Sequence, residues 1–145
     1  MRKVRSHFIT SDEGGQAVVE FAIVLPLLLL IITGLFDLAR ATWQENTLAY
    51  AAREGTRYAI VHGAASTSPA YPGNEQAVID VVRAAAVGVP TVSVVVTWLD
   101  GGCFNRACRV SVDVTAPFVP IPSQYMLGST FQITLRGGSL LVIQQ

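Results

Sequence analysis

A block of sixteen uncharged residues, Phe21–Phe36, constrains the fold of this chain more than any other feature. Extended back to Ala17, it becomes a run of twenty residues that only Glu20 interrupts. Twenty helical residues span about 30 Å, which is the thickness of the hydrocarbon core of a bilayer. A buried helix of a soluble domain is the alternative, but 145 residues could hardly cover so apolar a helix on every side. The block therefore predicts one transmembrane helix, residues 16–36.

Three basic residues, Arg2, Lys3 and Arg5, precede the block. The positive-inside rule then places the N-terminus in the cytoplasm, with residues 37–145 outside the cytoplasmic membrane as one domain. A cleaved signal peptide is the competing interpretation, because residues 39–41 loosely fit an A-x-A cleavage site. The apolar block is longer than the usual signal-peptide core, and acidic residues interrupt its approach, so we favour a retained anchor.

Composition argues against several functional classes. Hydrophobic residues make up 51% of the chain and charged residues 14%, against about 25% in average proteins. The net charge is zero, so the chain has no excess of basic residues with which to bind the phosphates of a nucleic acid. The two histidines suggest no Ser-His-acid set, and no phosphate-binding glycine loop is present. We therefore expect no enzyme, no cofactor, no metal site, no nucleic-acid partner and no small-molecule substrate.

Helical periodicity continues beyond the membrane to about Val61, with alanines on the apolar side that allow close packing. Pro26 is tolerated in a membrane helix, although it removes one backbone hydrogen bond and should kink the helix. Asp37 and Arg40 stand at the outer boundary with i,i+3 spacing. They predict an ion pair that anchors the helix at the interface, or a contact with the transmembrane helix of a partner.

Three further charged residues lie on the outer half of the helix, Arg53, Glu54 and Arg57. Their spacing allows an ion pair within the group or across to the sheet, and exposed pairs of this kind contribute only about 0–1 kcal/mol. The alternative is that they dock the exported domain or a second subunit.

The second half of the chain predicts a short helix followed by a small antiparallel sheet. Asn74 is the expected N-cap of the helix, because asparagine is a favoured capping residue. Period-two alternation predicts strands over residues 91–98 and 109–115, and three prolines (Pro117, Pro120 and Pro122) should then break the pattern into a crossing loop. A further strand begins near Phe131, and Gly137-Gly138 should form a bulge or tight turn before residues 139–143 extend the sheet. The expected class is α+β, with three or four strands packed on a short helix and on the long helix.

The only two cysteines, Cys103 and Cys108, lie between two of the expected strands. A disulfide between them would close a hairpin loop and would suit a domain outside the cytoplasm. A metal site would need more ligands, and the spacing does not match the C-x-x-C of redox motifs.

The residues around Gly15 point to a family. Gly15-Gln16-Ala17 precedes Val19-Glu20-Phe21-Ala22, and further matching groups follow it: Leu25-Pro26, Phe36-Asp37 with Arg40, Ala51-Ala52-Arg53-Glu54-Gly55, and Arg57-Tyr58-Ala59. This run resembles the TadE-like minor pilins, or pseudopilins, of tight-adherence (Tad, or Flp) pilus systems. The resemblance implies a pilin-like fold and a prepilin-type leader, residues 1–15, which a membrane peptidase removes between Gly15 and Gln16. Gly137-Gly138 departs from the continuous final strand that is frequent in such proteins.

Glu20 is the most informative residue of the apolar helix. A carboxylate in lipid costs several kcal/mol unless it is paired, so such charges are usually functional. Glu20 follows Gln16 by about one helical turn and lies on the same face. After cleavage it could meet the free amine of Gln16 or that of a neighbouring subunit, and the resemblance implies that the second contact sets register in assembly. Alternatively, Glu20 snorkels to the membrane surface.

The resemblance also implies partners and a location. The partners are the membrane itself, a prepilin peptidase, other minor and major pilins, and an assembly platform with its ATPase. The chain would sit in the bacterial cytoplasmic membrane or enter an adhesive pilus. A single-pass anchor that presents an extracytoplasmic binding domain, with an untrimmed leader and no pilus role, is the alternative.

Overall fold

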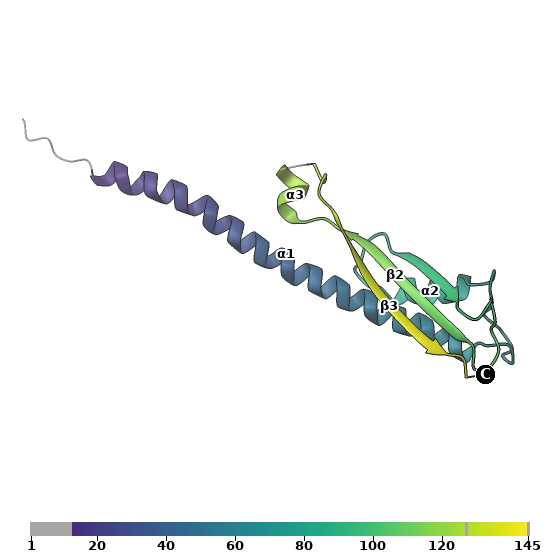
Figure 1. Cartoon of the computed structure of the whole chain (residues 1–145). Coiled ribbons are helices and arrows are strands. Elements are labelled where there is room, and N and C mark those ends of the chain that lie inside the picture. The colour runs from purple at the N-terminus through teal and green to yellow at the C-terminus, as the bar shows by residue number, and fades with distance from the viewer. Residues whose placement is uncertain (1–12, 127, 145) are drawn as a thin grey trace, which may run out of the picture.

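The structure is a computed structural model that describes residues 13–126 and 128–144. Most of the expected leader, residues 1–12, lies outside the described residues. Figure 1 shows a long helix whose N-terminal part projects alone, while a small sheet and a second helix pack around its other end. The α+β class with one long N-terminal helix is therefore confirmed.

The long helix, α1, runs without a break from Glu13 to Val61 and contains 49 residues, including Pro26. At 1.5 Å per residue it is about 70 Å long. It is long and apolar enough to cross a membrane, and none of its most apolar segment is buried against the rest of the chain. Burial begins at Asp37 and becomes regular from Gln44 onward, where the other elements pack.

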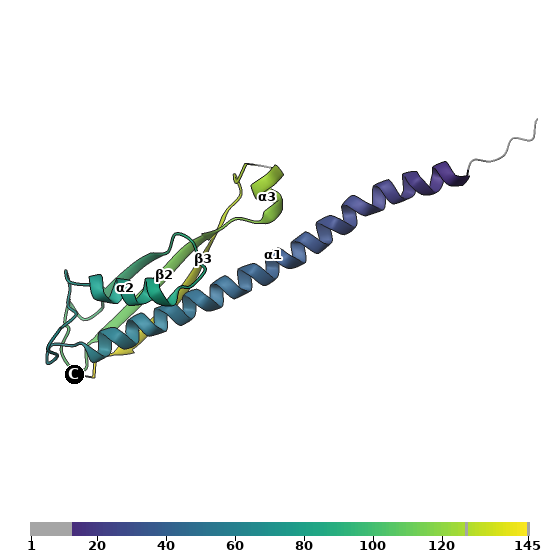
Figure 2. The same cartoon turned by 180° about the vertical axis from the view of Figure 1, so that it is seen from behind.

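The sheet has three antiparallel strands in the order β1-β2-β3. They span Ser93–Trp98, Arg109–Phe118 and Ile133–Val142. The C-terminal part of α1 and the short helix α2, Gln76–Ala85, pack on one face of this sheet (Figure 2). The other face carries mostly exposed and half-buried side chains, as the period-two alternation predicted.

The core lies between these two layers. The central strand β2 places Val110, Val112 and Val114 on the inner face, where none has exposed surface. Val78 and Val82 of α2 are equally buried, and so is a strip of α1 that consists mainly of alanine, together with Leu48. Small residues on α1 let the sheet and α2 approach closely, which is the arrangement that the alanine-rich face predicted.

Gly137 and Gly138 form neither the bulge nor the tight turn that the sequence suggested. Strand β3 continues through both, pairing Gly137 with Val114 and Gly138 with Asp113. The reason for a glycine is a close approach, because a Cβ at Gly137 would collide with the backbone of Leu48 and Ala49 in α1. Gly137 therefore allows the sheet to lie directly against the helix.

The prolines act differently from the prediction as well. Strand β2 passes through Pro117, which pairs with Thr134, and ends at Phe118. This is possible because β1 reaches only as far as Thr115 in the register, so one side of β2 at Pro117 has no neighbouring strand in the described part of the chain. The expected crossing loop contains a short helix, α3, from Ile121 to Met126.

Asn74 does not cap α2. Glu75 occupies the N-cap position and its side chain makes no capping hydrogen bond. The Glu75 carboxylate instead accepts a hydrogen bond from the indole nitrogen of Trp98, at 3.2 Å between Nε1 and Oε1. Glu75 thus ties the start of α2 to the end of β1 and satisfies the polar atom of a buried tryptophan.

Candidate functional site

The first turns of α1 hold the expected cleavage and assembly residues. Gly15, Gln16 and Glu20 are exposed, and together with Val19 and Ile23 they line one shallow hollow on the helix surface. The helix begins at Glu13, so the Gly15–Gln16 peptide bond lies within its first turn. Gly15 and Gln16, whose peptide bond is expected to be cut, therefore lie on the same face of the helix as Glu20, about one turn later.

Glu20 has no hydrogen-bond or ion-pair partner among the residues that the structure describes. It stands on a helix surface that is otherwise apolar and exposed, with Val19 and Phe21 beside it. Away from water, an unpaired carboxylate on such a surface is unfavourable unless a cation or a hydrogen-bond donor contacts it.

Asp37 joins α1 to α3 at the point where the projecting part of α1 meets the folded domain. One carboxylate oxygen accepts a hydrogen bond from Arg40 Nη1 at 2.9 Å, and the other accepts one from the backbone amide of Ile121 at 2.8 Å. Asp37 is only 8% exposed. The Arg40 guanidinium also lies over the ring of Phe118, with its central carbon 5.4 Å from the ring centroid. The predicted Asp37–Arg40 pair is present, and the contact with Ile121 is a link that the sequence did not indicate.

An apolar groove lies between α3 and the projecting part of α1. Its α1 wall consists of Pro26, Leu29, Leu30 and Thr33, and its α3 wall of Ile121, Pro122 and Tyr125. Figures 1 and 2 both show α3 beyond the end of the sheet, displaced toward the N-terminal half of α1. Pro26 is thus part of a groove wall, in addition to the kink that the sequence predicts.

Arg53, Glu54 and Arg57 do not form the predicted ion pair with one another or with the sheet. Neither arginine has a charged partner among the described residues, and both are exposed. Glu54 and Arg57 instead border a hollow with Tyr58 and His62, whose rings stack with centroids 3.9 Å apart. The three charges do not fasten the domain to its own helix and remain accessible on its surface.

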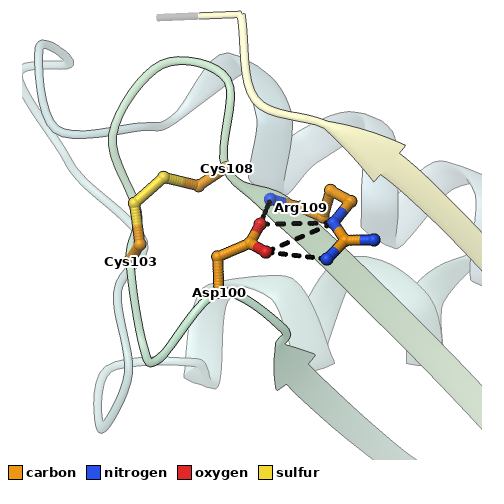
Figure 3. Close-up of a disulfide and its surroundings, with 4 residues drawn as sticks. All are labelled: Asp100, Cys103, Cys108 and Arg109. Atoms are coloured by element: carbon orange, nitrogen blue, oxygen red, sulfur yellow. Dashed lines mark hydrogen bonds and ion pairs between the residues drawn. A yellow bond between two sulfur atoms is a disulfide. The ribbon is translucent and has the colours of Figure 1, made fainter.

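The β1–β2 loop contains the predicted disulfide, Cys103–Cys108, whose Cα atoms are 5.9 Å apart. Beside it, Asp100 accepts hydrogen bonds from the backbone amide and the guanidinium of Arg109 (Figure 3), at 2.7 Å from the amide and 2.8 Å from Nη2. The Arg109 side chain is the main cause that lowers the pKa of Asp100, and the same contact raises the pKa of Arg109. Asp100 thus closes the hairpin together with the disulfide.

The α3 region carries two exposed aromatic residues. Tyr125 is 80% exposed and Phe131 is 56% exposed, so neither packs in the core. The usable signal was the absence of charge, because no charged residue occurs between Asp113 and Arg136. Within the described residues, no group of three His, Cys, Asp or Glu side chains could hold a metal ion.

Comparison with known protein families gives one match. Residues 15–57 match the family described as "TadE-like protein". The match begins at Gly15, continues through most of α1 and contains none of the sheet. No curated protein and no solved structure gives a significant match. Over residues 15–57 the chain is TadE-like, which confirms the resemblance read from the sequence.

Proposed function

We propose that this chain, TadE-like over residues 15–57, is a minor pilin or pseudopilin that takes part in the assembly of a tight-adherence pilus. In this proposal α1 anchors the chain in the bacterial cytoplasmic membrane, with the N-terminus in the cytoplasm and the folded domain outside. The role is structural and non-catalytic. Its partners are a prepilin peptidase, other minor and major pilins, and an assembly platform with its ATPase.

The observation that carries the proposal is the arrangement of Gly15, Gln16 and Glu20 at the start of an exposed apolar helix. The family match starts at the same glycine. A peptidase would hydrolyse the Gly15–Gln16 bond. The water oxygen bonds the carbonyl carbon of Gly15 to give a carboxylate, and the nitrogen of Gln16 takes up hydrogen to become a free α-amine. That amine carries a positive charge near neutral pH, since α-amino groups have a pKa of about 7.7–8.0.

The new amine would provide the partner that Glu20 lacks. Within one chain the two groups lie a single turn apart on one face of α1. In an assembly, the amine of a second subunit can reach the same carboxylate, and only one axial offset between the two helices brings them together. Glu20 would therefore set the register between neighbouring subunits.

Cleavage is tested by the intact mass and N-terminal sequence of the membrane-extracted chain, from hosts with and without the prepilin peptidase. We expect a chain that begins at Gln16 only when the peptidase is present. A start at Met1 in both hosts would favour an untrimmed anchor with a binding domain and no pilus role. A start near Thr42 would indicate a secreted domain, and either result would overturn the proposal.

The register role is tested by Glu20→Gln, which keeps the shape of the side chain but removes its charge. We expect normal membrane insertion and normal cleavage, but loss of pilus assembly. Glu45→Gln is the matched control, because Glu45 is an exposed glutamate of the same helix beyond the apolar segment. Unchanged pili in the Glu20 variant would refute the register role.

A further inference from the structure

Helix α3 runs back along the apolar part of α1. Its first residue, Ile121, is tied to Asp37, while Pro122 and Tyr125 face Pro26, Leu29, Leu30 and Thr33 across the groove. Positions 26–33 precede Asp37 by four to eleven residues. At 1.5 Å per residue, α3 therefore lies alongside the part of α1 about 6–16 Å from Asp37, on the N-terminal side.

This position of α3 is incompatible with a bilayer whose outer surface lies on the N-terminal side of Pro26. If the bilayer stopped before Pro26, only residues 16–25 of α1 would remain in it. Ten helical residues cover about 15 Å, half of a hydrocarbon core of about 30 Å. Residues before Gly15 could not supply the missing length, since Asp12 and Glu13 are charged. A helix that crosses the membrane therefore brings α3 into the membrane with it.

The surface of the α3 region suits that position. No charged residue occurs over positions 114–135, a stretch of twenty-two residues. Tyr125 and Phe131 are both exposed. Tyrosine is enriched where the hydrocarbon core meets the headgroups, and phenylalanine is an apolar side chain that lipid can bury.

Internal hydrogen bonds reduce the cost of placing this region in lipid. Ser123 Oγ donates to the carbonyl of Phe131 at 3.0 Å and accepts from its amide at 3.2 Å. The carbonyl of Ser123 accepts a further bond from the amide of Ser129 at 3.0 Å. In the groove wall, Thr33 Oγ1 donates to the carbonyl of Leu29 at 2.9 Å. These polar groups are satisfied within the chain, as groups away from water must be.

We propose that α3 and residues 128–131 form a second membrane contact, inserted in the outer leaflet, with lipid acyl chains in the groove between α3 and α1. Lipid is the occupant that these observations select. The groove walls carry no charge, the Thr33 hydroxyl is bonded to backbone carbonyls of its own helix, and the walls lie at the depth of the acyl chains. The proposal rests on the membrane placement of α1 given under the proposed function.

Such a contact would fix the folded domain relative to the bilayer. A domain anchored by a single helix can rotate about that helix and tilt relative to the bilayer. A second membrane contact beside the helix restricts both motions and so defines the orientation of the domain. The link between Asp37 and Ile121 would hold the two contacts at a constant spacing. The face that the domain presents to a neighbouring subunit would then be determined before assembly begins.

Spin labels on the full chain in phosphatidylethanolamine–phosphatidylglycerol vesicles, at low protein-to-lipid ratio, test the insertion. The labels are attached through Tyr125→Cys and, separately, Phe131→Cys, both at exposed positions. Both described cysteines are in the disulfide, so only the introduced thiol reacts. Ile31→Cys, exposed on α1 at similar depth, is the lipid control, and Val87→Cys, exposed beside α2, is the water control.

The measurement is the collision rate of each label with oxygen, which concentrates in lipid, relative to a water-soluble nickel chelate. We expect the ratio at positions 125 and 131 to shift toward the value at 31 and away from that at 87. Water-like ratios at 125 and 131 with a lipid-like ratio at 31 would overturn the insertion and leave the proposed function intact. A water-like ratio at 31 as well would overturn both. Labels at 125 shielded from both reagents would mean that protein, rather than lipid, occupies the groove.

Discussion

Asp37 accepts a hydrogen bond from the backbone amide of Ile121, a residue 84 positions later in the chain, at 2.8 Å. The bond joins the middle of α1 to the first residue of α3. The same carboxylate holds Arg40, so one nearly buried side chain fixes both the helix surface and the segment that leaves the sheet. Asp37 thus attaches α3 to α1 at the point where the projecting helix meets the folded domain.

Replacing Asp37 should release α3 from α1. Asp37→Ala leaves the Ile121 amide without its acceptor, and losing a hydrogen bond to a charged group costs about 1–3 kcal/mol. We expect a lower free energy of unfolding, measured by urea titration of the detergent-solubilised chain, and a more mobile spin label at position 125.

Arg40→Gln is the control for the ion pair. It removes the charge partner of Asp37 but keeps the acceptor for Ile121, and the Arg40 side chain is 44% exposed, so the loss should be below about 1 kcal/mol. An equal increase in label mobility in both variants would show that the ion pair, and not the amide bond, positions α3.

Gly137 and Gly138 offer a matched pair of substitutions on neighbouring residues of β3. Gly137→Ala places a methyl group against the backbone of Leu48 and Ala49, which cannot move away, so the sheet must lift from α1. We expect a loss of about 1–3 kcal/mol, typical of overpacking. Gly138→Ala points to the open face, where the nearest atom is the Asp113 carboxylate at 3.0 Å, a side chain that can rotate.

Unfolding of both variants, followed by near-ultraviolet circular dichroism, separates the two effects. The Gly138 variant should remain close to the parent chain. If Gly138→Ala were as damaging as Gly137→Ala, a cause shared by both positions would be required, and the close approach of β3 to α1 would not explain the loss.

The sequence was sufficient where a single periodic or covalent signal decides the structure. Alternation identified the buried valines of β2, the apolar block identified α1, and two cysteines identified their own disulfide. It failed where a residue answers to a distant neighbour. Position 137 requires a glycine because the backbone of Leu48 lies against it. Glu75 accepts a hydrogen bond from Trp98 and does not cap α2 with its side chain. Neither contact is visible in the residues next to it in sequence.

The candidate site divides in the same way. Gly15, Gln16 and Glu20 lie within about one turn of one helix, so their shared face followed from spacing alone. The groove between α1 and α3 was not predictable, because it depends on where a strand of the sheet ends relative to the helix. The proline-rich stretch looked like a loop, since three prolines usually interrupt regular structure.

Asp100 should make the stability of the chain depend on pH. Its pKa is lowered in the folded chain by Arg109, so the stabilising contact is complete above the ordinary aspartate pKa of about 3.9 and is lost as pH falls through the lower, folded value. Arg109 stays charged throughout, because its own pKa is raised. Asp100→Asn should therefore lower Tm at neutral pH, and the difference from the parent chain should shrink below about pH 4.

Thermal unfolding of the two chains over pH 2–7 checks this expectation. Asp80→Asn is the control, because Asp80 bonds only Gln76 among the described residues and has no cationic partner there. A Tm difference for the Asp100 variant that stays constant down to the lowest pH would show that the contact depends on hydrogen-bond geometry and not on the charge of the carboxylate.

Gly55 tests whether α1 and α2 are held at the smallest possible distance. A Cβ at this position would overlap Cγ2 of Val82 and would lie 3.5 Å from Cγ1 of Val112. Alanine is better than glycine in a helix by up to about 1 kcal/mol, but overpacking a core costs about 1–3 kcal/mol. We expect Gly55→Ala to destabilise the chain on balance. Gly34→Ala, at a helical glycine with no atom within 4 Å of the added Cβ, should be neutral or stabilising.

A double-mutant cycle with Val82→Ala identifies the cause. Val82→Ala alone removes buried methyl groups and should be destabilising, since Val82 has no exposed surface. In the double variant the methyl group of Ala at 55 enters the space that the valine vacated, so the combined loss should be smaller than the sum of the single losses by about 0.5–3 kcal/mol. Additive losses would mean that the contact between Gly55 and Val82 does not set the distance between α1 and α2.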